Sequence, residues 1–207
     1  MMAADPDPFN RWEAGQKLGL RFLLQQIEGY QQGREISVDE RLIHGLHNLL
    51  LDRDSDQAFL AMAMALPSEN WIGQQMAVLD PVAVCNVRQQ FRALIARTLC
   101  IDLVQCYDRL HSAEPYRYSA HEAGRRSLRN ICLSYLLAPT LAGELEPCLL
   151  QRGISQYRQA DNMTDAIAAL GALVNADLTT GTELLADFHA KWQHDPLVVD
   201  KWLILQA

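Results

Sequence analysis

The chain has few of the residues that make tight turns. Its 207 residues include 11 Gly and 8 Pro, too few for the frequent turns of an all-β fold. No segment alternates strictly between apolar and polar residues over five or more positions, so we expect no sheet. No apolar run approaches the ~20 residues that a membrane-spanning helix needs. These absences leave an all-α fold, and the length allows one large domain or two small ones.

Positive charge is also scarce. Lys and Arg number 18 against 25 Asp and Glu, which gives a formal net charge of −7. The 15 Arg and three Lys are scattered and form no basic stripe, and an acidic surface repels phosphate. Hydrophobic residues make up 49% of the chain and charged residues 21%, which is typical of a folded protein. We therefore expect a folded domain whose partners include neither nucleic acid nor a membrane.

The cysteines indicate a reducing compartment. Their number, five, is odd, and no two have Cys-x-x-Cys spacing. Most lie within apolar runs, a pattern that favours buried free thiols. Residues 1–8 contain neither a basic n-region nor an apolar h-region, so they do not read as a signal peptide. We predict a cytoplasmic protein. The five are Cys85, Cys100, Cys106, Cys132 and Cys148.

Asp-Pro pairs predict the starts of three helices. An Asp before a helix accepts a backbone N–H, and Pro is tolerated at the first helical position. Asp7-Pro8 precedes a helical pattern that runs to about Tyr30, and Asp80-Pro81 precedes the longest predicted helix, which runs to about Arg109. Asp195-Pro196 opens the last helix. Each pair predicts a helix boundary from local chemistry alone.

Ser and Asn residues predict three further helix starts. Ser37 with Glu40, and Ser119 with Glu122, have the spacing of a capping box. Asn162 is followed by a third amphipathic pattern. Residues 111–118 read as a loop, and Pro139 with Gly143 interrupts the helical pattern. Other helices are expected over residues 57–66, 69–78, 144–159 and 182–193.

Nine or ten short-linked helices are compatible with two architectures, a globular bundle or a solenoid of stacked helix pairs. Helix pairs recur at intervals of roughly 40 residues, a length usual for helical repeats. We therefore predict one all-α domain over residues 1–207, an irregular α-solenoid of antiparallel helix pairs. Residues 202–207 end within an apolar helix, whereas terminal repeats normally turn a polar face outward. This favours a piece of a longer chain over a helix that docks and simply ends.

No histidine pattern in the chain predicts a metal site. His121-Glu122 would begin the zinc motif His-Glu-x-x-His, but the position for the second histidine is Arg125. His44 and His47 share a helical face, yet no acidic residue or cysteine lies near enough in sequence to complete a ligand set. For both patterns an ordinary helix surface is the favoured interpretation, and we predict no metal ligand.

The remaining chemical candidates favour structural interpretations too. No Gly-rich phosphate loop and no Gly-x-Ser-x-Gly elbow is present, and nothing local predicts a cysteine nucleophile. We predict no catalytic residue, and the sequence does not indicate the substrate-binding residues. His189 and His194 fit a helix end. Asp52, Asp54 and Asp56 fit a solvated turn. The four tryptophans fit core packing; they are Trp12, Trp71, Trp192 and Trp202.

Five stretches resemble the C-terminal helical domain of bacterial aminopeptidase N, a zinc-dependent alanyl aminopeptidase. The most specific are Ala160 to Asp165 (ADNMTD) and Asp195 to Trp202 (DPLVVDKW), and both also read as helix starts that act as structural joints. The resemblance covers essentially the whole chain. The stretches are residues 8–16 (PFNRWEAGQ), 64–81 (MALPSENWIGQQMAVLDP), 125–136 (RRSLRNICLSYL), 156–174 (QYRQADNMTDAIAALGALV) and 188–207 (FHAKWQHDPLVVDKWLILQA).

The resemblance implies an enzyme whose active site lies outside this chain. In that family of metalloproteases, zinc is held by a His-Glu-x-x-His helix and a further Glu, and the enzyme is a hydrolase that releases N-terminal amino acids from peptides. None of these elements is present here, so no catalytic residue carries over. The resemblance implies no cofactor in this chain, zinc in the full-length enzyme, and a fragment that is inert alone. It also implies that residues 1–207 are the first two-thirds or so of the helical domain.

In the resembled enzymes the helical domain is a solenoid that lies against the catalytic domain and roofs an internal cavity. The implied role is therefore to enclose the active site and to limit peptide access. The implied partners are the catalytic domain, the peptide substrates of the parent, and a second copy of the chain at a surface exposed by the cut. The alternative is a free-standing helical-repeat module that binds a protein or peptide in its concave face.

Overall fold

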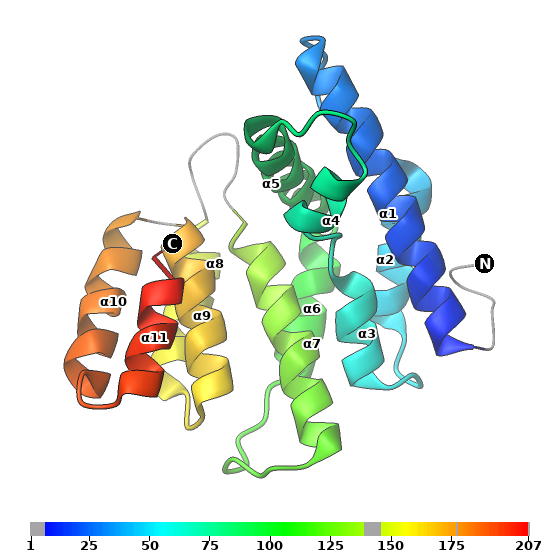
Figure 1. The fold of residues 1–207 in the computed structure, drawn as a ribbon. Coiled ribbons are helices and arrows are strands. Elements are labelled where there is room, and N and C mark those ends of the chain that lie inside the picture. Colours follow the sequence, from blue (N-terminus) through cyan, green and yellow to red (C-terminus); the bar gives the residue numbers. More distant parts are fainter. Residues whose placement is uncertain (1–6, 139–145, 177, 207) are drawn as a thin grey trace.

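A computed structural model describes residues 7–138, 146–176 and 178–206, and these ranges contain eleven α-helices and no strand. Figure 1 shows the helices standing side by side, from α1 and α2 at one end to α10 and α11 at the other. The helices are α1 (Pro8–Gln31), α2 (Glu40–Leu51), α3 (Gln57–Met64), α4 (Glu69–Gln74), α5 (Pro81–Thr98), α6 (Cys100–Arg109), α7 (Ala120–Leu136), α8 (Pro147–Gln159), α9 (Met163–Ala176), α10 (Leu178–Trp192) and α11 (Pro196–Ile204).

Most of the predicted helix starts are confirmed. The carboxylates of Asp7, Asp80 and Asp195 each accept a backbone N–H from two or three residues further on, at 2.8–3.0 Å. Ser119 accepts from the N–H of the third residue of α7, and Asn162 does the same for α9. These caps satisfy N–H groups that the first helical turn leaves without a partner.

The predicted cap at Ser37 is wrong. The N-cap of α2 is Asp39, whose carboxylate accepts from the backbone N–H of Arg41 at 2.8 Å. The backbone N–H of Ser37 instead donates to the side chain of Gln26 on α1, at 2.9 Å. This tertiary contact keeps Ser37 in the loop between α1 and α2, so the helix begins two residues later, where Asp39 is an equally good N-cap.

The long helix predicted from Pro81 to Arg109 is divided in two. Leu99 separates α5 from α6 and leaves the helical conformation, with φ −104° and ψ 20°. The hydroxyl of Thr98 donates to the carbonyl of Leu94, a contact that bends helices. The division lets Leu99 bury its side chain. It also makes α1 the longest helix of the described part, and eleven helices replace the predicted nine or ten.

Other boundaries shift by a few residues. The helix predicted over 69–78 ends at Gln74, and the one predicted from 182 begins at Leu178. The helix predicted over 57–66 ends at Met64, ahead of the proline at 67, and Met62 on it is 58% exposed rather than buried. The predicted interruption at Pro139 and Gly143, and the start of the helix predicted over 144–159, lie outside the described residues.

The contacts between helices follow a chain of neighbours. Helix α1 packs on α3 and α5, α7 packs on α3, α6 and α9, and α9 packs on α8 and α10. Helix α11 then packs on α10. Helices α8 to α11 alternate in direction from one to the next (Figure 1). This arrangement confirms the predicted all-α solenoid of stacked helix pairs. No helix in the described ranges combines the length and the apolar character that a bilayer crossing requires.

Buried polar side chains connect the helices of the larger core. The hydroxyl of Tyr135 on α7 donates to the carbonyl of Met64 at 2.7 Å, and burial raises the pKa of this tyrosine to about 12. The guanidinium of Arg92 on α5 lies 5.7 Å from the Tyr135 ring centre and donates to the carbonyl of Ser134. Burial lowers the pKa of Arg92. These contacts lock α7 onto α3 and α5.

Candidate functional site

The predicted histidine patterns hold no metal site in the described part of the chain. His121 is exposed beside Glu122, and His44 is exposed on α2. His47 is different because Asp102 of α6 lies 2.9 Å from its Nδ1, a partner that sequence distance hid. The pair connects α2 to α6. No group of three or more His, Cys, Asp or Glu suited to a metal occurs within the described ranges.

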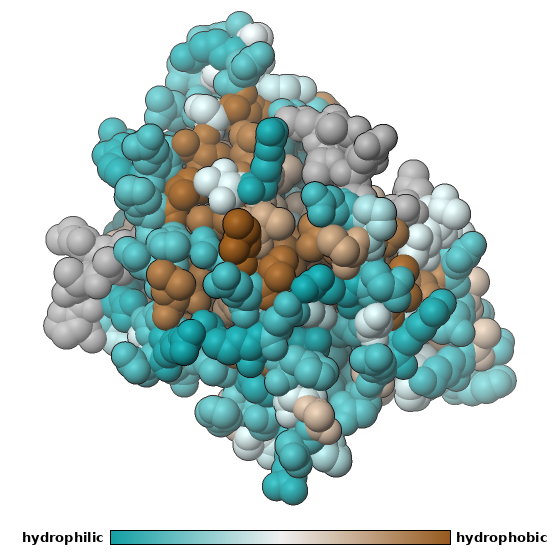
Figure 2. All heavy atoms as spheres, turned by 180° about the vertical axis from the view of Figure 1, so that it is seen from behind, coloured by the Kyte–Doolittle hydropathy of each residue, from teal (hydrophilic) through white to brown (hydrophobic). Residues whose placement is uncertain are grey.

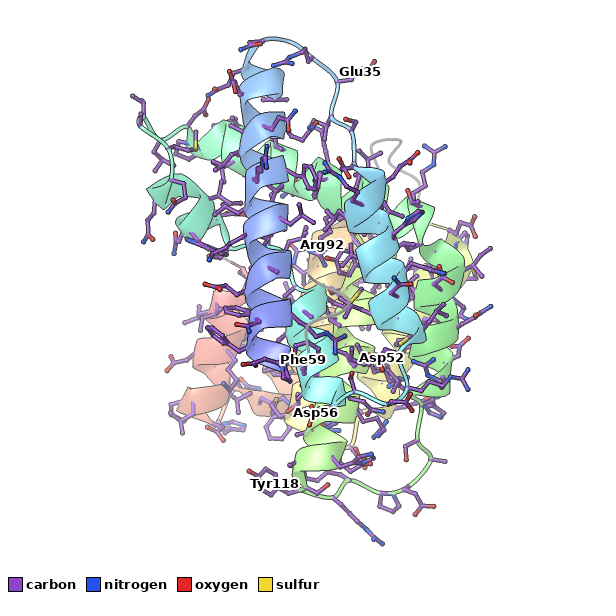
Figure 3. All side chains as sticks on the ribbon, turned by 90° about the vertical axis from the view of Figure 1, so that its right-hand side faces the viewer. Glu35, Asp52, Asp56, Phe59, Arg92 and Tyr118 are labelled. Atoms are coloured by element: carbon purple, nitrogen blue, oxygen red, sulfur yellow. The ribbon has the colours of Figure 1, made fainter. Side chains whose placement is uncertain are left out.

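The acidic loop between α2 and α3 is a turn and a helix cap. The carboxylate of Asp52 accepts from the backbone N–H groups of Asp54 and Ser55 and from the Ser55 hydroxyl. Partial burial raises the pKa of Asp52, but these hydrogen bonds outweigh it and the net shift is downward. Asp56 caps α3, and Figure 3 shows Asp52 and Asp56 at neighbouring helix ends, close to Phe59.

The cysteines are all free thiols, but only two of the five are fully buried. Cys106 and Cys132 lie side by side between α6 and α7. A hydrogen bond from Cys132 lowers the pKa of Cys106, with a smaller contribution from Arg109, whose guanidinium lies 3.4 Å from the sulfur. No sequence pattern predicted this lowered pKa. The thiols are buried, so they lack the exposure of a reactive cysteine. Cys148, in contrast, is exposed.

All four tryptophans were predicted to pack in the core, and three of them do. Trp71, Trp192 and Trp202 pack against the core. The indole N–H of Trp202 on α11 donates to the carbonyl of Leu185 on α10 at 2.9 Å, and its ring lies 4.5 Å from that of His189. Trp12 instead contacts Phe9 near the start of α1, with ring centres 5.9 Å apart.

A polar pocket of about 470 Å³ is the best candidate for a binding site. Its walls come from the loop that links α6 to α7 (residues 111–116), from the first turns of α7, and from the corner between α8 and α9. In Figure 1 this region is the lower end of the molecule, where the α6–α7 loop hangs beside the start of α9. The volume suits a small molecule.

A largely buried hydrogen-bond network adjoins this pocket, and Gln156, Asn162 and Asp165 belong to both. The Tyr107 hydroxyl donates to the side-chain oxygen of Gln156 at 2.9 Å, and the Gln156 amide donates to Asn130 at 2.7 Å. Asn130 and Asn162 then donate to the two carboxylate oxygens of Asp165, at 2.9 and 3.0 Å. Four helices therefore meet through one network, whose groups satisfy each other away from water.

Three arginines of α7 line the pocket, and their hydrogen bonding differs. Arg125 is fully engaged, because it donates twice to Glu122 and once to the carbonyl of Leu110. Arg126 is buried, stacks over the ring of Tyr116 at 4.8 Å, and donates to a backbone carbonyl of the loop at a long 3.5 Å. Arg129 donates to the hydroxyl of Tyr107 at 2.9 Å.

Acidic side chains of the pocket are held in the charged form. The Asn162 amide and the backbone N–H of Tyr116 lower the pKa of Asp161, and Arg125 lowers that of Glu122. Through its 2.7 Å bond to Tyr116, Asp161 also fastens the loop to the α8–α9 corner. The pocket therefore presents both charge signs, with the arginines on α7 and Asp161 on the corner.

Sequence reasoning did not find this pocket. The arginines at 125, 126 and 129 and the corner residues around Asn162 lie in the stretches that carry the family resemblance, but both stretches were interpreted as structure. The spacing of the arginines, one helical turn from 125 to 129, could have indicated a shared face. Nothing in the sequence indicated that residues 45 positions apart, Tyr116 and Asp161, would meet.

The fold defines this chain as a helical-repeat protein, an α-solenoid of stacked helix pairs. Comparison with known families agrees. The chain belongs to the family described as "Domain of unknown function (DUF3458_C) ARM repeats", whose model matches residues 1–207.

The relatives of this chain are aminopeptidases. Aminopeptidase N of Escherichia coli (strain K12) is 34% identical over 201 residues, which are 96% of this chain and 22% of that protein. Aminopeptidase N of Caulobacter vibrioides is 34% identical over 207 residues, 100% of this chain and 23% of that protein. Among solved structures, Legionella pneumophila aminopeptidase A in complex with aspartic acid matches with a TM-score of 0.80 at 25% identity, over 99% of this chain and 24% of that one. The chain spans about a fifth of the length of the curated relatives it matches.

Proposed function

We propose that this chain is the helical part of a zinc aminopeptidase, where it lies against the catalytic domain and encloses the cavity around the active site. In this role it limits the peptides that reach the zinc, and it belongs to a longer helical domain. The observation that carries the proposal is the match of the whole chain to about a fifth of several aminopeptidases, with the same fold in a solved one. The activity and the peptide substrates are properties of the whole enzyme.

Exposed apolar side chains support a large protein partner. Val82 at the start of α5 is 67% exposed and Ile101 on α6 is 74% exposed. Figure 2 shows apolar side chains gathered on the face seen from behind, with hydrophilic side chains around them. Such surfaces are typical of contacts with another protein region. We also propose a cytoplasmic location, which the five free cysteines support.

The test uses the polypeptide encoded upstream in the same reading frame, mixed with the 207-residue chain. We expect a stable complex by analytical ultracentrifugation. We also expect the complex to hydrolyse alanine p-nitroanilide and to discriminate against a long folded peptide more strongly than the upstream part alone does. An upstream part without a His-Glu-x-x-His motif, or a discrimination that the chain leaves unchanged, would contradict the proposal. Peptide binding without a complex would favour the free-standing module.

Two variants identify the contact face. Val82→Asp and Ile101→Asp each add one charge at an exposed apolar position, without touching the core. The one that lies in the contact should weaken the complex at least about tenfold, because it buries an unpaired carboxylate. Gln89→Asp adds the same charge at an exposed polar position of α5 and serves as the matched control. If neither variant weakens the complex more than the control, these apolar positions are not the contact.

A further inference from the structure

Two arginines of the pocket have donor groups without a partner. Arg126 is 5% exposed, yet within the described residues its Nε has no hydrogen-bond partner, and its bond to the carbonyl of Arg117 is long at 3.5 Å. In the same part of the chain, the Nε of Arg129 is also buried without a partner. The neighbouring Arg125 shows the contrast, since Glu122 and Leu110 engage its guanidinium. A buried guanidinium with unmet donors is costly, so it calls for an explanation.

Three of the four acids that line the pocket accept hydrogen bonds from groups other than Arg126 and Arg129. Glu122 is bound by Arg125, and its nearer oxygen is 4.0 Å from Arg126. Both oxygens of Asp165 accept from asparagine amides. Asp161 accepts from the loop backbone. Both arginines line the pocket, so an anion inside it would meet their guanidinium groups through the terminal nitrogens, since the two Nε atoms are closed off from solvent.

We propose that this pocket binds the carboxylate of a free amino acid or short peptide, held by the guanidinium groups of Arg126 and Arg129. Guanidinium and carboxylate match in shape and charge and form strong paired hydrogen bonds. Asp161 and Glu114 line the same pocket and provide negative charge for the amine of such a ligand. Walls of both signs favour a zwitterion over a multiply charged phosphate. The volume of about 470 Å³ admits a ligand of this size.

The link to catalysis rests on the proposed function. An aminopeptidase releases amino acids and shortened peptides, and both are zwitterions with a free carboxylate. A site for them on the helical part would place a product-binding pocket away from the zinc. The Tyr116 loop and the α8–α9 corner already form one wall of it, because Asp161 joins the two.

The experiment titrates the 207-residue chain with L-alanyl-L-alanine, its C-terminal amide, and inorganic phosphate. Binding is measured by calorimetry and located by backbone amide NMR shifts. We expect the dipeptide to bind and to shift residues 111–116 and 125–129, the amide to bind at least about tenfold more weakly, and phosphate to bind more weakly than the dipeptide. Equal binding of acid and amide, tighter binding of phosphate, or shifts elsewhere would overturn the proposal.

Variants separate the two arginines from general charge effects. Arg126→Gln and Arg129→Gln should each weaken dipeptide binding about tenfold or more. Arg158→Gln removes the same charge at an exposed position of α8 outside the pocket lining and should change nothing. If Arg126→Gln does not fold, Arg129→Gln and the comparison of acid with amide decide. Wild-type affinity in Arg129→Gln would overturn the proposal. If the dipeptide does not bind, the pocket proposal is overturned. The proposed function is tested separately, by complex formation with the catalytic part, so the two proposals fail independently.

Discussion

Helices α1–α7 and helices α8–α11 contribute unequally to the buried apolar core. The first region has a continuous core that includes large side chains without solvent exposure, such as Phe91 and Leu103. In the described part of the second region, the buried core residues are fewer. They are Ala169, Leu170, Ala172, Leu173, Leu184, Phe188 and Val198. A solenoid adds core only where neighbouring pairs stack, so the second region depends on its contact with α7.

The difference is greatest at α11. Val198 is its buried residue, while Leu197, Leu203 and Ile204 are exposed. The helix is held on α10 through the indole of Trp202. A helix with one buried position and large exposed ones is weakly stabilised by its own contacts. The comparison therefore predicts that stability falls from the first region to the second. The first experiment below tests this directly, and three others test the contacts that hold the regions together.

The largest expected loss of stability comes from truncating one buried aromatic side chain in each region. Phe91→Ala and Phe188→Ala should each cost about 3–5 kcal/mol of local stability, because both rings are buried. We expect hydrogen exchange by mass spectrometry to show that Phe91→Ala exposes amides throughout the chain. Phe188→Ala should expose those of α9–α11 alone. Phe9→Ala, at an exposed ring, is the control. Equal loss of protection in both regions would mean one cooperative unit.

The next largest loss of stability is expected where two helices cross at a glycine and their backbones lie close together. An added Cβ at Gly181 of α10 would lie 2.7 Å from the Cα of Val174, and one at Gly124 of α7 would lie 2.9 Å from the backbone N of Ala58. Backbone cannot move aside as a side chain can. Gly181→Ala and Gly124→Ala should therefore each destabilise the chain by about 1–3 kcal/mol in urea unfolding, despite the better helix propensity of Ala.

A matched control is Gly73→Ala. Its Cβ would meet the methyl end of Leu79, an exposed and movable side chain. We expect this variant to be close to neutral, or stabilised through helix propensity. A loss at position 73 as large as at Gly181 would show that crowding by backbone is not the cause.

The network between the regions gives a smaller effect. Tyr107→Phe removes the hydroxyl that joins α6 to Gln156 of α8 and should cost about 1 kcal/mol or slightly more. Combining it with Gln156→Leu in a double-mutant cycle measures the coupling across the junction. We expect a loss for the pair that is smaller than the sum of the single losses. Strict additivity would show that the hydrogen bond does not join the two regions energetically.

The smallest effect is a pH dependence at the loop. The folded pKa of Asp161 lies below its unfolded value near 3.8, mainly because the Asn162 amide donates to it. Its stabilising contribution is therefore complete above that value and is lost as pH falls through the lower folded pKa. Urea unfolding of wild type and Asp161→Asn should differ at pH 5 and converge toward pH 3. A constant difference would contradict this assignment.

The sequence predicted those parts of the fold that depend on local chemistry. Asp80 and Asn162 each specify a helix start with their own side chain, so no tertiary information was needed. The break at Leu99 was missed because it depends on what this side chain packs against. His47 and Asp102 were not recognised as a pair because 55 residues separate them.

The pocket was missed for the same reason. Its arginines were visible on one helical turn, but the facing wall comes from a loop and a corner brought together by folding. Whether each nitrogen of an arginine finds an acceptor, as in Arg125, or the Nε has none among the described residues, as in Arg126, depends on carbonyls and rings that no spacing rule places. Local motifs therefore predicted the helices, whereas the site required the packing.

The Asp-Pro starts of α1, α5 and α11 have an evolutionary consequence. In each, the carboxylate and the fixed proline ring set the helix boundary within a few residues. A boundary defined so locally stays in place when material is inserted or deleted elsewhere in the gene. Such a chain can gain or lose whole helices at its ends while the remaining ones keep their register, which gives natural selection a way to resize the molecule.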